Sequence, residues 1–304
     1  MSQTLSPRGA PAPQIVSFPS SDGTVVGHLH LPHGHDPSRR YPAVAVSGSF
    51  SSVKEQMGDL YATELARRGV MALAIDYRNY GQSSGAIRQY EDPAAKAVDL
   101  SSALAFLRRR SDVSGTGLLG ICTSGGTVLY TVAENQAVGA VATIAGFFAE
   151  PSMMIQMRGA EGVESLRAAG RAAKENHKKN GVIDTILAYS ETDQTAANVA
   201  PLPYYFDPAR GAVPEWRNAF AVMAWDSMLD FDPVSKASKV TAPTLVIHSD
   251  GSAFPEQARK VFDLLAGPKE LHWAEGGHLD FYDQAKQVHD AADRAAAHFR
   301  TRLG

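Results

Sequence analysis

Four short apolar runs, separated by helical patterns, constrain the fold of this chain more than any other feature. They lie at residues 42–46, 70–75, 117–122 and 138–144. Strands without polar positions are typical of a parallel sheet that is covered on both faces. Strands that alternate with helices predict βαβ units. We therefore expect an α/β fold with a doubly wound, mostly parallel sheet.

The rest of the chain predicts how this fold is organised. The alternation stops after residue 146 and resumes with apolar runs at 243–249 and 270–273. Because the intervening segment leaves from the carboxyl end of a strand, where ligands bind in such sheets, we interpret it as a mainly helical cap over the site. A helical decoration away from the site is the alternative. The predicted units are a flexible tail (1–13), a core that begins with a β-hairpin (14–146 and 226–304) and the cap (147–225).

A strand–turn–helix pattern surrounds the one cysteine of the chain. The apolar run ends at Cys122, small residues follow, and a helical pattern begins at Thr127. Gly120 and Gly125 leave room for a nucleophile on a strained turn. The helix that follows points its N-terminus at the thiol, which favours the thiolate. The pattern therefore predicts that Cys122 is a catalytic nucleophile.

Two other interpretations of this stretch stay open. In a shifted frame Ser124 is the nucleophile, but Cys122 then stands where the pattern requires glycine. A lone cysteine is also often a small, buried hydrophobic residue. The glycines on both sides favour the nucleophile, because a residue that only fills the core does not need them.

A thiol nucleophile needs a base, and the base needs an acid that orients it. In sheets with a nucleophile on such a turn, the acid and then a histidine follow along the chain, each at the carboxyl end of a strand. Asp250 follows one strand, and His278 follows the last strand behind two glycines. They are the predicted acid and base, with Asp226 and Asp230 as alternative acids.

An oxyanion formed during acyl transfer needs two N–H donors. We expect the first from Thr123, directly after the nucleophile, and the second from Ser49 or Phe50, in the loop after the strand at 42–46. Four aromatic residues of the cap either line a substrate pocket or pack in the interior: Tyr204, Tyr205, Trp216 and Trp225.

Three segments together resemble a known family. They are Val53-Lys54-Glu55-Gln56, Gly120-Ile121-Cys122-Thr123-Ser124-Gly125-Gly126 and Gly277-His278-x-Asp280-x-Tyr282-Asp283. In this order they resemble the α/β-hydrolase superfamily, in its dienelactone-hydrolase-like branch with a cysteine nucleophile. The resemblance implies a Cys122–Asp250–His278 triad and an ester, lactone or thioester substrate. It also implies that Glu55 contacts the resting thiol; a surface glutamate at the start of a helix is the alternative.

Composition narrows the remaining function classes. A net charge of −3 is too small to indicate a nucleic acid or an anionic membrane as partner. No apolar run approaches the roughly 20 residues of a membrane span, and no zinc or nucleotide-binding motif is present. We expect a cytoplasmic enzyme without metal or cofactor that acts on a small, partly apolar acyl substrate; a homodimer is compatible with the sequence.

The predicted function is hydrolysis of an ester, lactone or thioester through an acyl-enzyme intermediate. Three alternatives use the same fold. They are an acyltransferase or cyclase that uses the same acyl-thioester, a C–C bond hydrolase, and a non-catalytic ligand-binding homologue.

Overall fold

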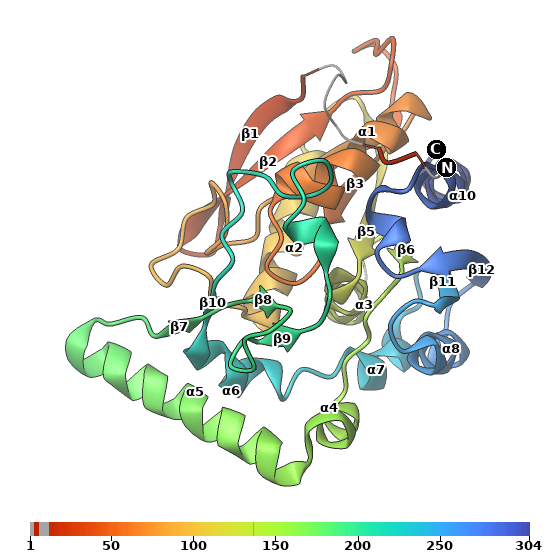
Figure 1. Cartoon of the computed structure of the whole chain (residues 1–304). Helices are drawn as coiled ribbons and strands as arrows, with labels where there is room; N and C mark the ends of the chain where they lie inside the picture. Colours follow the sequence, from red (N-terminus) through yellow and green to blue (C-terminus); the bar gives the residue numbers. More distant parts are fainter. Residues whose placement is uncertain (1–2, 6–11, 136) are drawn as a thin grey trace.

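An eight-stranded sheet forms the centre of the molecule in a computed structural model of the chain (Figure 1). The structure describes residues 3–5, 12–135 and 137–304. Beginning at one edge, the strand order is β1-β2-β4-β3-β5-β6-β11-β12, and all neighbours from β4 onward are parallel. These strands are β1 (Gln14–Ser20), β2 (Gly23–His30), β3 (Tyr41–Ser47), β4 (Met71–Ile75), β5 (Val113–Ile121), β6 (Ala140–Ile144), β11 (Thr244–Gly251) and β12 (Lys269–Gly277). The predicted sheet and its N-terminal hairpin are confirmed.

Helices cover both faces of the sheet. In β3, Val44 and Val46 belong to one hydrophobic cluster, while Ala43 and Ala45 belong to another on the opposite face. This alternation explains why the strand is apolar at every position. The first cluster includes residues of α1 (Asp59–Arg67) and α10 (Ala285–Leu303), and the second includes residues of α2 (Pro93–Arg108), α3 (Thr123–Glu134) and α8 (Pro255–Leu264).

The start of α2 is encoded locally. The Asp92 side chain accepts a hydrogen bond from the Ala95 N–H at 3.1 Å, and Pro93 occupies the first helical position. Both residues are favoured at a helix N-terminus, because the cap satisfies a free N–H and proline has none to lose.

The segment predicted as a cap, residues 147–225, contains two helices and several short elements. Gly159, with φ +73°, separates α4 (Pro151–Arg158) from α5 (Ala160–Asn180). Four two-residue strands occur where none was expected, and Pro203–Tyr205 forms a short 3-10 turn. These strands are β7 (Thr185–Ile186), β8 (Tyr189–Ser190), β9 (Asn198–Val199) and β10 (Phe220–Ala221). Strands of two residues are too short to show an alternation of apolar and polar residues in the sequence.

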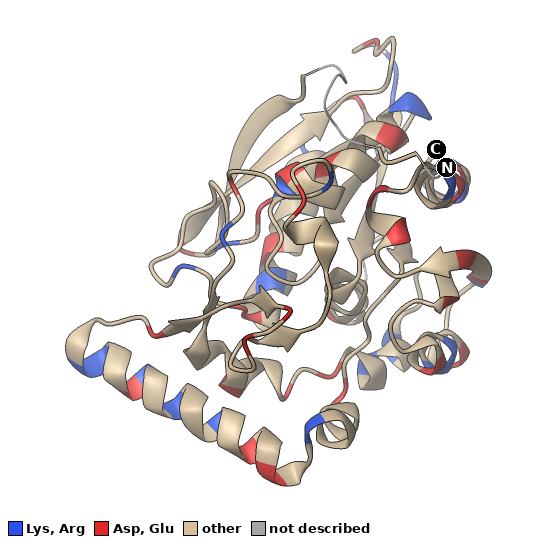
Figure 2. Ribbon diagram, in the orientation of Figure 1, with Lys and Arg blue, Asp and Glu red and all other residues tan. Residues whose placement is uncertain are grey.

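Charged residues of both signs are spread along α5, which extends along one side of the molecule (Figure 2). Within the part of the chain that the structure describes, no helix combines the length and the apolar character needed to cross a membrane.

Part of the predicted flexible tail is attached to the core. The Leu5 N–H donates to the Asp283 carbonyl at 2.6 Å, and the Ala285 N–H donates to the Gln3 carbonyl at 2.8 Å. Residues 3–5 therefore lie against the start of α10, contrary to the expectation of a loose segment. Residues 1–2 and 6–11 of the predicted tail lie outside the described residues.

Candidate active site

Cys122 occupies a strained turn between β5 and α3. Its φ of 55° and ψ of −122° are unusual for a residue with a side chain. The carbonyl of Cys122 accepts hydrogen bonds from the Gly125 and Phe147 N–H groups, both at 2.8 Å, and these bonds hold the turn. A Cβ at Gly120 would lie 2.2 Å from the Ser124 carbonyl oxygen. The glycine before the cysteine is thus required by the close approach of the turn.

Ser124, the alternative nucleophile, lies in the first turn of α3 and not at the strained position. Its hydroxyl is 3.1 Å from the hydroxyl of Tyr77, and both side chains are buried. The structure therefore gives Ser124 a partner within the core, while Cys122 has the conformation expected of a residue at such a turn.

The thiol of Cys122 is surrounded by hydrogen-bond donors. Hydrogen bonding from the Tyr282 hydroxyl and from the backbone N–H groups of Thr123 and Phe50 lowers the pKa of the thiol. Burial nevertheless raises the pKa of the Cys122 thiol, since these donors offset only part of the cost of a buried charge. The Thr123 N–H at the start of α3 favours the thiolate, as expected of a helix N-terminus, but burial has the larger effect.

The loop after β3 is held by hydroxyl groups of the cap segment. The Tyr189 hydroxyl donates to the Phe50 carbonyl at 2.9 Å, and the Ser49 hydroxyl lies 2.5 Å from the Tyr205 hydroxyl. Ser49, one of the two predicted sources of the second oxyanion donor, thus binds a tyrosine through its side chain, while Phe50 directs its N–H toward Cys122.

His278 lies on the loop after β12, where its two ring nitrogens face different partners. Nδ1 is 3.3 Å from the Ala253 N–H, and Nε2 is 3.1 Å from the Tyr282 hydroxyl. Burial, with a smaller contribution from the nearby His248, lowers the pKa of His278 to about 4. The imidazole is therefore neutral near pH 7, and it reaches the thiol region through Tyr282.

The predicted acid, Asp250, is not beside His278. Its side chain is 76% exposed and pairs with Arg259 at 2.9 Å, a contact that lowers the pKa of Asp250. Because β11 continues to Gly251, Asp250 is still part of the strand, and its side chain is directed to solvent. The alternative acids have other partners as well: Asp226 pairs with Lys174, and Asp230 pairs with Arg167. The Asp250–His278 contact of the predicted triad is therefore absent from the structure.

The aromatic residues predicted to line a pocket have different surroundings. The Tyr205 ring stacks on Tyr189 with centroids 4.2 Å apart, and Trp216 packs on Tyr205 with centroids 5.3 Å apart. Tyr204 packs edge-on against Tyr282. These four residues and Tyr282 form one cluster, which we call the tyrosine cluster: Tyr189, Tyr204, Tyr205, Trp216 and Tyr282.

Trp225 lies outside the tyrosine cluster. Its ring packs against Phe220 and lies beneath the Arg158 guanidinium, so its contacts are with the interior of the cap segment. Of the two tyrosine candidates, Tyr205 is the one whose pKa is raised by burial and also by the nearby Cys122.

Two residues of the tyrosine cluster were not assigned a role from the sequence. Tyr282 follows His278 by four residues, and the short helix α9 (Asp280–Asp283) brings both to the same side. That spacing was a signal in the sequence. Tyr189 gave none, because it lies in a segment without periodicity.

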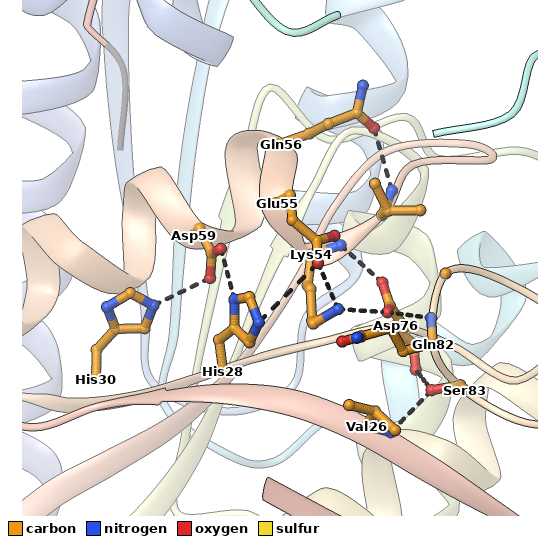
Figure 3. A network of polar contacts seen from close by, with 12 residues as sticks. Val26, His28, His30, Lys54, Glu55, Gln56, Asp59, Asp76, Gln82 and Ser83 are labelled. Carbon is orange, nitrogen blue, oxygen red and sulfur yellow. Dashed lines mark hydrogen bonds and ion pairs between the residues drawn. The ribbon is translucent and has the colours of Figure 1, made fainter. Parts of the chain in front are cut away.

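Glu55 belongs to a buried polar network and not to the surroundings of the thiol (Figure 3). Its carboxylate is 2.5 Å from the Lys54 ammonium, which also binds Asp76 at 2.8 Å. Burial and the nearby Asp76 raise the pKa of Glu55. The predicted contact between Glu55 and the thiol is not made, because the lysine before it turns the carboxylate toward the loop after β4. The network continues through His28, Asp59 and His30.

No group of three or more His, Cys, Asp or Glu side chains in the described ranges is arranged to hold a metal ion. A cavity of about 330 Å³ lies between this network and the cap segment. Its lining includes Glu55, Tyr204, Arg210 and Tyr282. Tyr282 therefore connects the cavity with the region of the thiol.

Solved structures of other proteins share the fold of this chain. The chain is similar to the crystal structure of hypothetical protein PA2218 from Pseudomonas aeruginosa, with a TM-score of 0.86, 24% identity and 99% of both chains covered. It also resembles a dienelactone hydrolase structure from Anabaena variabilis, with a TM-score of 0.58, 16% identity and coverage of 97% and 100% of the two chains. Thiohydrolase aneE of Aspergillus aculeatus is 26% identical over 277 residues, which are 86% of this chain and 84% of that protein.

The sequence pattern of the Alpha/beta hydrolase family matches residues 27–291. This match spans the sheet, the turn at Cys122 and the loop of His278. The chain therefore belongs to the alpha/beta hydrolase family and is a hydrolase.

Proposed function

We propose that the protein hydrolyses small acyl compounds, with Cys122 as nucleophile and an acyl-thioester as intermediate. One observation carries the proposal: a thiol on a strained turn receives hydrogen bonds from two backbone N–H groups, those of Thr123 and Phe50. These donors are the type that stabilises an oxyanion. A buried cysteine that only filled the core would not need them.

The reaction begins with attack of the Cys122 sulfur on the acyl carbonyl. A C–S bond forms, and the electron pair of the C=O double bond moves to the oxygen, where the Thr123 and Phe50 N–H groups hold it. The bond to the leaving group breaks, and water then cleaves the acyl-thioester. Because neither N–H can be removed by substitution of a side chain, the nucleophile is the part of this proposal to test.

The substrates are esters, lactones or thioesters of a partly apolar acyl group. Three members of the tyrosine cluster, Tyr189, Tyr205 and Tyr282, are close to the thiol, and we interpret residues 147–225 as a cap. The name thiohydrolase given to one relative favours thioesters within this set. His278 completes the site through its Nε2, which is 3.1 Å from the Tyr282 hydroxyl, and its Nδ1 faces the Ala253 N–H in place of a carboxylate.

The experiment is intact-mass analysis after a short pulse with activated acyl esters and thioesters. Wild type is compared with Cys122→Ala and Ser124→Ala. We expect an acyl adduct in wild type and Ser124→Ala that is absent from Cys122→Ala. An adduct that disappears only in Ser124→Ala would show that the serine is the nucleophile, and turnover that survives in Cys122→Ala would overturn the mechanism.

A further inference from the structure

The hydroxyl of Tyr282 is linked to both His278 and Cys122. It lies 3.1 Å from Nε2 of His278, and hydrogen bonding from Tyr282 lowers the pKa of the Cys122 thiol. No direct hydrogen bond joins the thiol to the imidazole among the contacts of the described residues. His278 is thus linked to the Cys122 sulfur through the hydroxyl of Tyr282.

The partners of the imidazole set the direction of these hydrogen bonds. Nδ1 faces a backbone N–H, that of Ala253, and therefore accepts. In the neutral ring the hydrogen is then on Nε2, which donates to the Tyr282 oxygen, and Tyr282 donates to the sulfur. In a serine-type triad a carboxylate accepts from Nδ1 and leaves Nε2 free as a base. Here Nε2 of His278 donates to the Tyr282 oxygen, and the Tyr282 hydroxyl in turn donates to the Cys122 sulfur.

We propose that Tyr282 is a catalytic residue that stabilises the Cys122 thiolate by a direct hydrogen bond, and that the site is selective for acyl donors whose leaving group departs without a proton, above all thioesters. This inference rests on the proposed function of Cys122 as an acyl-accepting nucleophile.

Several contacts fix the position of Tyr282. The carbonyl of Phe281 accepts a hydrogen bond from the Tyr61 hydroxyl at 2.7 Å. The Asp283 carboxylate receives two hydrogen bonds from Arg210 of the cap segment, at 2.6 and 2.7 Å. The residues on both sides of Tyr282 are therefore anchored, one to the core and one to the cap, and its hydroxyl has little freedom to leave the sulfur.

The proton balance explains the selectivity. The thiol loses its proton to solvent, and the thiolate attacks the carbonyl to form the C–S bond. A thioester leaving group departs as a thiolate with the electron pair of the broken C–S bond and needs no proton. When water cleaves the acyl-enzyme, its proton goes to solvent, and the Cys122 sulfur departs as a thiolate that again accepts from Tyr282. An alkoxide leaving group would require a general acid, and the neutral His278, with its Nε2 hydrogen engaged by Tyr282, is a poor one.

The other polar and charged side chains described around the site influence the sulfur electrostatically and not by a hydrogen bond to it. Tyr189 and Tyr205 of the cap segment face the sulfur as neutral phenols whose pKa values are raised by burial. Lys96 of α2 acts on the thiol only through its charge. Among the residues that the structure describes, His248 of β11 is the titratable group that lowers the pKa of His278. Tyr282 is thus the side chain that donates to the sulfur and links it to His278.

The test is the pH dependence of the alkylation of Cys122 by iodoacetamide, measured by mass on the full chain. Wild type is compared with Tyr282→Phe and with Tyr80→Phe, a matched control in which an equally buried tyrosine outside the cluster loses its hydroxyl. Loss of a hydrogen bond to a charged group changes an equilibrium constant by roughly 10- to 100-fold, and here that constant is the ionisation of the Cys122 thiol. We expect Tyr282→Phe to react about 10- to 100-fold more slowly at pH 7, with its profile moved to higher pH, while Tyr80→Phe follows wild type.

Two results would overturn the assignment of Tyr282. One is a Tyr282→Phe profile that coincides with wild type. The other is a wild-type rate that stays flat from pH 5 to pH 8, which is the behaviour of a thiolate–imidazolium pair.

The selectivity is tested with a thioester and an alkyl ester of the same acyl group. We expect kcat/KM to favour the thioester by at least about 100-fold, because the ester lacks a general acid for its leaving group. Equal rates would refute the selectivity. Absence of any acyl adduct on Cys122 would instead refute the proposed function, and the alkylation profile would still decide the role of Tyr282.

Discussion

Replacing Lys54 by methionine tests how the loop beside the thiol is held in place. The Lys54 side chain has no exposed surface, and its ammonium binds both Asp76 and Glu55. The backbone N–H of Lys54 also donates to Asp76 at 2.8 Å. Through these bonds Asp76, after β4, anchors the segment that follows the loop of Phe50 (Figure 3).

The expected cost follows from the charges that remain. In Lys54→Met, two carboxylates stay close together without their shared cation, and breaking a buried ion pair in this way costs about 3–5 kcal/mol of the free energy of unfolding. Asp76 keeps a hydrogen bond from the Gln82 N–H at 2.9 Å, which limits the loss. Replacing Asp76 by asparagine in the same chain removes one of the two uncompensated charges. The double variant Lys54→Met/Asp76→Asn should therefore be more stable than Lys54→Met alone.

The pH dependence of this loss has a defined sign. The pKa of Glu55 in the folded protein is already raised by burial and by Asp76, and loss of the lysine raises it further. A group with a raised folded-state pKa contributes stability at low pH and loses it as pH rises through that pKa. The deficit of Lys54→Met should therefore be smaller at pH 5 than at pH 7.

Urea unfolding of wild type, both variants and Lys178→Met measures these differences. Lys178 is 75% exposed on α5 and serves as a lysine-to-methionine control that leaves stability nearly unchanged. A Lys54→Met protein within about 1 kcal/mol of wild type at pH 7 would refute the reasoning, since a buried, uncompensated pair costs more than that. A deficit that is the same at both pH values would show that Glu55 does not take up the proton.

Three further predictions concern the candidate site. Asp250→Asn should keep kcat/KM within about twofold of wild type because its carboxylate pairs with Arg259, while His278→Asn should lower it by about 10-fold because the Tyr282 hydroxyl loses its hydrogen bond to Nε2; equal losses in the two variants would restore the predicted triad. Gly120→Ala should lower the free energy of unfolding by about 1–3 kcal/mol, because the added Cβ clashes with the Ser124 carbonyl. Gly162→Ala, whose Cβ would have its nearest neighbour at 3.6 Å, is the control and should not lower it. Urea midpoints that change equally in the two variants would contradict this. Since the pKa of His278 is about 4 when folded and roughly 6.5 in an unfolded chain, the unfolded state binds the proton more tightly, and stability should fall as pH drops from about 6.5 to 4. Urea midpoints at pH 4.5 and 7 should differ more for wild type than for His278→Asn. An equal difference would show that protonation of His278 does not cause the loss of stability at low pH.

The candidate site could be predicted only in part. Cys122 and His278 could be proposed from the sequence because each stands at the end of an apolar run with glycines beside it. Asp250 was placed correctly after an apolar run, but its partner depends on how far β11 continues and on Arg259, which lies one helix further along the chain. Glu55 was assigned to the thiol by resemblance, and the lysine beside it directs it to Asp76.

The sequence by itself determined the sheet, the helices that cover it and the turn that presents Cys122. These depend on the period of apolar residues and on small residues at fixed positions, which are properties of neighbouring positions in the chain. Only the tertiary structure brought Tyr189, Tyr205 and Tyr282 together around the thiol and placed Tyr282 between Cys122 and His278. Contacts between residues so far apart in the chain depend on how the cap segment packs on the core, and no local pattern encodes that packing.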